Sequence, residues 1–71
     1  MLNGGDKVKA NRKKLELAMA RACMNSADLQ KATGLPRPTL NNVIVGRVVR
    51  PGTIGRIAVA LNIDVTEILE Q

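Results

Sequence analysis

The 71-residue chain has no phenylalanine, tyrosine, tryptophan or histidine, and its one cysteine is Cys23. Without aromatic rings, it offers no platform on which single-stranded bases could stack. Without histidine, a Cys–His nucleophile is excluded, and no cluster of residues supplies the ligand set of a metal site. A single cysteine forms no intramolecular disulfide, which is typical of proteins in a reducing cytoplasm. We therefore expect no enzyme, no metal and no cofactor.

Long apolar runs are also missing. None approaches the ~20 residues of a transmembrane span, and the N-terminus lacks the apolar core of a signal peptide. We expect a cytoplasmic location and no membrane partner. The length suits one domain over residues 1–71, of which residues 1–5 are expected to form a flexible tail.

Charge is abundant and uneven. The chain has eleven lysines and arginines and six acidic residues, so its net charge is +5. A positive net charge favours a polyanionic partner. Six of the eleven cations lie in the first third of the chain and the other five follow through the middle, whereas every charged residue after Arg56 is acidic. One pole of the folded domain should therefore be positive, and the C-terminal end should not be.

A first helix is predicted from near Asp6. Apolar residues recur there at roughly helical spacing, and basic residues fill the other face. The apolar positions are Val8, Leu15, Met19 and Ala22.

A second helix is predicted from Asn25 to about Thr33. Asn25 is a favoured N-cap residue, and Asp28 places negative charge in the first turn, where the helix dipole favours it. Gly34 should end the helix, because glycine adopts the left-handed backbone without steric cost.

A third helix is predicted to begin at residues 36–38. Pro36 and Pro38 fit a first turn, whose N–H groups have no partner inside the helix. Leu40 and Val43 should face inward, and Gly46 should close the helix.

A loop from Arg47 to Gly52 should lead to a fourth helix that is capped by Thr53 and ended by Asn62. Its buried stripe is expected to be Ile54, Ile57, Ala58 and Leu61. A fifth helix is predicted over residues 65–70, introduced by a capping box of Asp64 and Glu67.

The stretch from Asn25 to Gly46 thus forms two short helices joined by a tight turn, the pattern of a helix-turn-helix. Here the chain resembles the Cro/C1-type (XRE-like) family of regulators, over nearly everything from Leu15 to Leu69. The resemblance includes GLPRPTLNNVIVG around the turn and IGRIAVALNIDVTEIL behind it. It implies an all-α, five-helix, lambda-repressor-like DNA-binding domain.

The resemblance also implies which residues touch double-stranded DNA. The positions that correspond to base-contacting ones are Arg37, Pro38, Thr39, Asn41 and Asn42. Those that correspond to phosphate-contacting ones are Ser26, Arg47 and Arg50. By its chemistry, Arg37 can pair with guanine and Asn42 with adenine, whereas Pro38 offers only apolar contact.

The chain departs from the family pattern at three positions. Gln30 stands where a small alanine is usual, Ile44 where glutamate is common, and Pro36 where a capping serine or threonine is usual. Gln30 could change the angle between the second and third helices. Ile44 could pack onto the loop. Because Pro36 has no capping side chain, the N-terminal cap of the third helix must come from another residue.

We expect a transcriptional repressor that binds a palindromic operator as a homodimer, because one helix reads too few bases for useful discrimination. The dimer surface is expected at the fifth helix, with help from Val48 and Val49. Control could come from a protein antagonist or a toxin partner.

Two alternatives stay open at this point. The same fold could act as an antitoxin or adaptor, through an apolar patch of Ile44, Val45, Val48 and Val49. It could also bind nucleic acid without specificity, or an anionic membrane, through the first helix.

Overall fold

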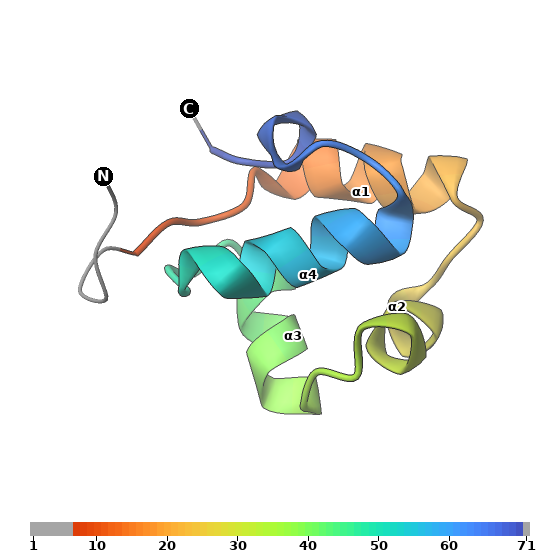
Figure 1. The fold of residues 1–71 in the computed structure, drawn as a ribbon, viewed down its shortest axis with the longest axis horizontal. Helices are drawn as coiled ribbons and strands as arrows, with labels where there is room; N and C mark the ends of the chain where they lie inside the picture. The colour runs from red at the N-terminus through yellow and green to blue at the C-terminus, as the bar shows by residue number, and fades with distance from the viewer. Residues whose placement is uncertain (1–6, 71) are drawn as a thin grey trace.

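A computed structural model, which describes residues 7–70, places four α-helices and one short 3-10 helix around an apolar core (Figure 1). In Figure 1, α4 runs between α1 and η1 on one side and the α2–α3 pair on the other. The elements are α1 (Arg12–Arg21), α2 (Ser26–Thr33), α3 (Arg37–Ile44), α4 (Pro51–Leu61) and η1 (Val65–Glu67). The all-α class is confirmed, whereas the count of five α-helices was wrong. The tail expected over residues 1–5 lies outside the described residues.

The core contains only apolar side chains within residues 7–70. Its members come from every α-helix, from the segment before α1, from the loops on either side of α3 and from the residue after η1: Ala10, Leu15, Ala18, Leu29, Leu35, Leu40, Val43, Val49, Ile54, Ile57, Ala58, Leu61 and Ile68. The predicted stripe of the fourth helix is therefore confirmed. Full burial of one such Leu or Ile stabilises the fold by about 1.5–3 kcal/mol, so a core of this size depends on each of them.

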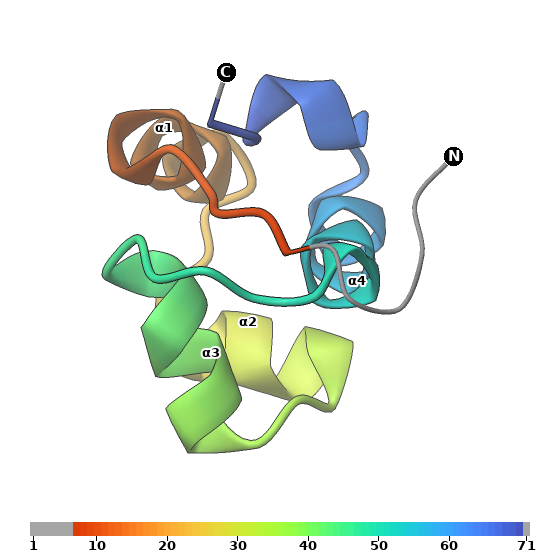
Figure 2. The ribbon, with the colours of Figure 1, turned by 90° about the vertical axis from the view of Figure 1, so that its left-hand side faces the viewer.

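Residues 7–11 are extended rather than helical, so the predicted helix start near Asp6 was wrong. α1 begins after Asn11, whose side-chain oxygen accepts a hydrogen bond of 3.0 Å from the Lys14 N–H. Before it, Val8 and Val49 exchange two main-chain hydrogen bonds of 2.8 and 2.6 Å. In Figure 2 the segment before α1 runs beside the loop that follows α3. Val8 and Ala10 pack on the core with the two-residue period of a strand, which the helical reading of Val8 overlooked.

α4 begins earlier than the sequence predicted. Its N-cap is Arg50, and Pro51 occupies the first helical position, so the prediction of Thr53 as the cap was wrong. Proline suits this position because its backbone angle is already helical and its missing N–H would have no partner there. At the other end Asn62 adopts the left-handed conformation with φ of 59°, as predicted.

The C-terminal segment forms one 3-10 turn instead of a helix over residues 65–70. Beyond η1 the chain turns back to pair with the segment before α1, where Leu69 bridges Ala10. Asn11 donates its main-chain N–H to the Ile68 carbonyl at 2.8 Å, and Glu70 donates to the Lys9 carbonyl at 2.9 Å. These long-range bonds satisfy main-chain groups that a fifth helix would have used.

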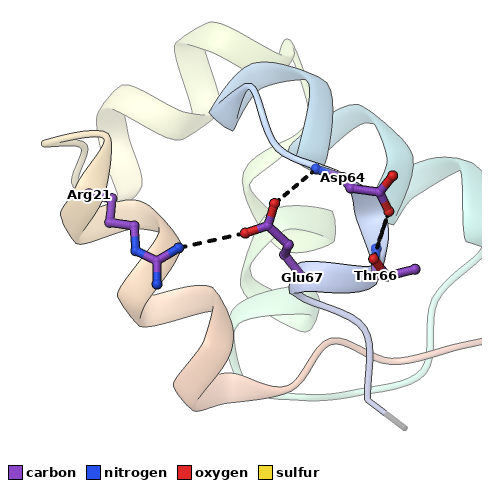
Figure 3. Close-up of polar contacts among 4 residues, drawn as sticks. All are labelled: Arg21, Asp64, Thr66 and Glu67. Atoms are coloured by element: carbon purple, nitrogen blue, oxygen red, sulfur yellow. Dashed lines mark hydrogen bonds and ion pairs between the residues drawn. The ribbon is translucent and has the colours of Figure 1, made fainter.

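The predicted capping box at η1 is confirmed (Figure 3). The Asp64 carboxylate accepts from the Thr66 N–H at 2.9 Å and from its hydroxyl at 2.7 Å. In return the Asp64 N–H donates to Glu67 at 3.4 Å, and Glu67 also pairs with Arg21 of α1 at 3.6 Å. This exposed ion pair contributes at most about 1 kcal/mol, so η1 is held mainly by Ile68 in the core.

Candidate nucleic-acid interface

The start of α2 is locked by a reciprocal pair of hydrogen bonds. The Asn25 side chain accepts from the Asp28 N–H at 2.9 Å, and the Asp28 carboxylate accepts from the Asn25 N–H at 3.1 Å. This capping box satisfies two main-chain donors that the first turn leaves without helical partners. The predicted helix start is thereby confirmed, and α2 packs against the core through buried Leu29.

The turn between α2 and α3 is tight and well bonded. Gly34 has a φ of 72°, the left-handed conformation predicted for it, and its N–H donates to the Gln30 carbonyl at 2.9 Å. The Thr33 hydroxyl donates to the Leu29 carbonyl at 2.9 Å and accepts from the Leu35 N–H at 3.2 Å. These bonds fix the direction in which the chain enters α3.

α3 presents a polar face to solvent and an apolar face to the core. Leu40 and Val43 are buried, as predicted. Pro36 is the N-cap and Pro38 stands in the first turn, and no side chain caps the helix. The expectation that a cap would come from another residue is therefore not met. Fixed proline backbone angles replace a side-chain cap in defining this helix start.

A shallow groove of about 540 Å³ runs between α2 and α3. Its lining consists of Ser26, Ala27, Gln30, Arg37, Pro38, Leu40, Asn41 and Ile44. It brings together four of the predicted DNA contacts: Ser26 from the start of α2, and Arg37, Pro38 and Asn41 from α3. No acidic side chain lines it, so its electrostatic character comes from the Arg37 guanidinium.

The remaining predicted contacts lie outside this groove. Thr39 and Asn42 are half-buried on α3, and neither lines the groove. Arg47 and Arg50 are exposed in the loop that follows α3. The loop is anchored at both ends, because Arg47 donates its N–H to the Asn42 carbonyl at 2.9 Å and Val49 pairs with Val8.

Gln30 is a groove residue that the list of expected contacts omitted. Its side chain is half-buried beside the exposed first turn of α3. The signal for it was present in the sequence, as a polar residue where the family usually has alanine. Ile44, the second departure, packs against the core and also lines the groove.

The apolar patch expected around the loop is smaller than predicted. Val49 is only 9% exposed, and its main-chain groups pair with Val8, so it lines neither a dimer surface nor an adaptor surface. Val45 and Val48 remain exposed, at 43% and 58%. Val48 and Val49 are neighbours on extended backbone, so the burial of Val49 directs the Val48 side chain outward.

Within residues 7–70, no helix is long and apolar enough to cross a membrane. No group of three or more His, Cys, Asp or Glu residues in the same range is arranged to hold a metal ion.

A family model described as "Cro/C1-type HTH DNA-binding domain" matches residues 14–71, which is most of the chain. The chain therefore belongs to this family of helix-turn-helix DNA-binding domains, as its resemblance predicted. α2 and α3, joined by the turn at Gly34, are its helix-turn-helix. Such DNA-binding families are generally not enzymes. No curated protein and no solved structure matches the chain.

Proposed function

We propose that the chain is a sequence-specific transcriptional regulator that inserts α3 into the major groove of double-stranded DNA. One observation carries the proposal. The first turn of α3 exposes Arg37 next to Asn41, on a groove whose lining contains no acid to neutralise it. The major groove is just wide enough for one helix, and guanidinium and amide groups match the edges of guanine and adenine.

We propose that different residues contact the bases and the phosphate backbone of the DNA. Arg37, Pro38, Thr39, Asn41 and Asn42 are the proposed base contacts. We propose that Ser26, at the start of α2, binds DNA phosphates. Arg47 and Arg50, in the loop after α3, are proposed to bind phosphates on the other side of the major groove of the DNA. Phosphate contacts set the register of the helix on the duplex, and base contacts supply the discrimination.

Two copies are proposed to bind a palindromic operator and to repress by occupying the promoter. Half-sites of such operators lie about 34 Å apart, one turn of the duplex. The longest dimension of the domain is 33 Å, so two copies fit side by side at that spacing. The C-terminal end, with Val48 as the exposed apolar residue of the nearby loop, is the proposed dimer surface. The whole chain would act in the cytoplasm as one domain.

A second function, as an antitoxin or adaptor that binds another protein, is favoured by one observation. Val45 and Val48 expose apolar surface at the end of α3 and in the loop after it, where a protein partner could cover them. A toxin or an antagonist bound there would stand next to Arg47. Such a partner could therefore also control DNA binding.

Selection from a random duplex library, followed by titration at several salt concentrations, tests the main proposal. We expect one palindromic site to be bound at least about 10³-fold more tightly than random duplex. The logarithm of the binding constant should fall by about 0.9 per neutralised phosphate. Equal affinity for all duplexes would overturn the regulator function. Sedimentation of the free and bound protein tests the dimer.

A further inference from the structure

The extended segment before α1 lies against the loop that follows α3. Val8 and Val49 exchange main-chain hydrogen bonds of 2.8 and 2.6 Å in an antiparallel bridge. Both side chains turn toward the core, since Val49 is buried and Val8 packs against the buried cluster. Because successive side chains of extended backbone alternate, their chain neighbours must point outward.

The register of this bridge brings basic residues of two distant segments close together. Antiparallel pairing places Lys7 opposite Arg50, and Lys9 opposite Val48. All four side chains are exposed. The bridge thus extends the cationic surface of the loop onto a part of the chain far from it in sequence.

The first turn of α1 extends the same surface toward α3. A Cβ atom built on Gly46 would lie 3.3 Å from Cγ of Arg12, so the stem of Arg12 packs over the second residue after α3. Lys9, Arg12 and Lys13 line a hollow of about 340 Å³ that also contacts Val45 and Gly46. Basic groups therefore flank both the end of α3 and the loop.

This concentration of like charge has little internal compensation. Within residues 7–70, the one ion pair joins Glu67 to Arg21, at the opposite end of α1 from Arg12 and Lys13. Glu70 is the acid that lines the hollow, and one of its oxygens accepts a hydrogen bond from Asn11 at 3.3 Å. Like charges placed opposite each other destabilise a folded chain, and a bound polyanion removes that repulsion.

We infer that Lys7, Lys9, Arg12 and Lys13 form a second backbone-binding surface, which contacts DNA phosphates beside those held by Arg47 and Arg50. The inference rests on the proposed function only in that the partner is a duplex. It assigns to the segment before α1, and to the first turn of α1, a role that the helix-turn-helix alone does not contain. This surface raises affinity and salt dependence for all duplexes alike, because phosphates carry no sequence information.

The test compares two double variants that each remove two exposed lysine charges. Lys9→Gln with Lys13→Gln alters the proposed surface. Lys14→Gln with Lys31→Gln is the control, since Lys14 lies with Arg21 and Glu67 and Lys31 is in the last turn of α2. Arg12 is kept because its stem packs over Gly46. Circular dichroism melts establish that both variants fold.

Each variant is titrated with the selected duplex and with a random-sequence duplex over a range of salt concentrations. We expect the slope of log K against log salt to become shallower by about 1.8 in the Lys9/Lys13 variant, from about 0.9 per phosphate. The ratio of specific to random affinity should not change. Equal slopes for the two variants would overturn the inference.

Two further outcomes separate this inference from the proposed function. If the wild-type chain binds every duplex equally but the slopes still differ, sequence specificity fails and the second surface stands. If the Lys9/Lys13 variant loses binding to phosphatidylserine vesicles and keeps the wild-type slope on duplex, the segment binds lipid and the inference is overturned.

Discussion

Asn25 and Asp28 hold the first turn of α2 by exchanging hydrogen bonds of 2.9 and 3.1 Å between side chain and main chain. Asn25→Ala removes the cap, and we expect the free energy of unfolding to fall by about 1 kcal/mol. For a domain of this size, that corresponds to a fall in Tm of about 4–8 °C. Asn25→Ser keeps an acceptor and serves as the control. Equal melting of the Ala and Ser variants would contradict the role of the cap.

Gly34 should tolerate no ordinary side chain without cost. Its φ of 72° is left-handed, but a Cβ atom there would meet nothing within 4 Å. Gly34→Ala should therefore lower stability by about 1–2 kcal/mol through backbone strain alone. Gly34→Asn should cost less, because asparagine visits this conformation more readily. Thermal melts that rank Asn below Ala would refute the argument.

Gly55 presents the opposite case, inside α4. No left-handed φ is found there, and a Cβ atom would again meet nothing within 4 Å. Alanine at this position should raise the free energy of unfolding by about 0.5–1 kcal/mol, because glycine loses more backbone entropy in a helix. Chemical denaturation measures the change. A loss of stability in Gly55→Ala would indicate a close contact at this face that the single chain does not contain.

Arg37 and Arg50 should differ in what their loss does to DNA binding. Arg37→Ala should cost about 1–3 kcal/mol on the selected duplex and relax the preference at one base pair. Arg50→Ala should weaken binding to all duplexes by a similar factor and reduce the salt slope by about 1. Competition titrations with single-base variants of the site distinguish the two patterns. Identical patterns would refute the division between base and phosphate contacts.

Asp64 should make stability depend on acid pH. Hydrogen bonds from the Thr66 N–H and hydroxyl hold the pKa of its carboxyl below the ordinary value of 3.8. A carboxyl whose pKa is lower in the folded chain stabilises it above the unfolded pKa. That contribution is lost as the pH falls through the folded value.

Asp64→Asn removes this titration. The gap in unfolding free energy between wild type and the variant should therefore be constant from pH 7 to about pH 5, and should shrink below about pH 4. Denaturation curves at successive pH values measure the gap. A gap that stays constant down to pH 2 would show that the folded pKa of Asp64 is not lowered.

The sequence by itself determined the helix-turn-helix. The signals at Asn25, Gly34 and Pro38 act within one or two turns of helix, through hydrogen bonds and backbone angles that need no distant partner. The buried stripe of α4 follows from helical periodicity in the same way. These elements were predicted correctly because interactions between residues close in sequence determine them.

The contacts of the proposed site are only partly determined in this way. The family pattern places Arg37 and Asn41 on α3, but only packing of α2 against α3 puts them in one groove with Gln30. Likewise, the cationic run before α1 looked like a solvated helix face. The bridge between Val8 and Val49 instead places Lys7 opposite Arg50.

The tertiary structure alone decided the conformation of residues 7–11 and 65–70. Val8 has apolar neighbours at both helical and strand-like spacing, and its pairing with Val49, 41 positions away, selected the strand. Residues 68–70 found main-chain partners in residues 9–11, so the helix expected there stops after one 3-10 turn. A buried main-chain N–H must have an acceptor, and in a folded chain that acceptor can lie far away in sequence. Local sequence patterns do not predict such distant partners.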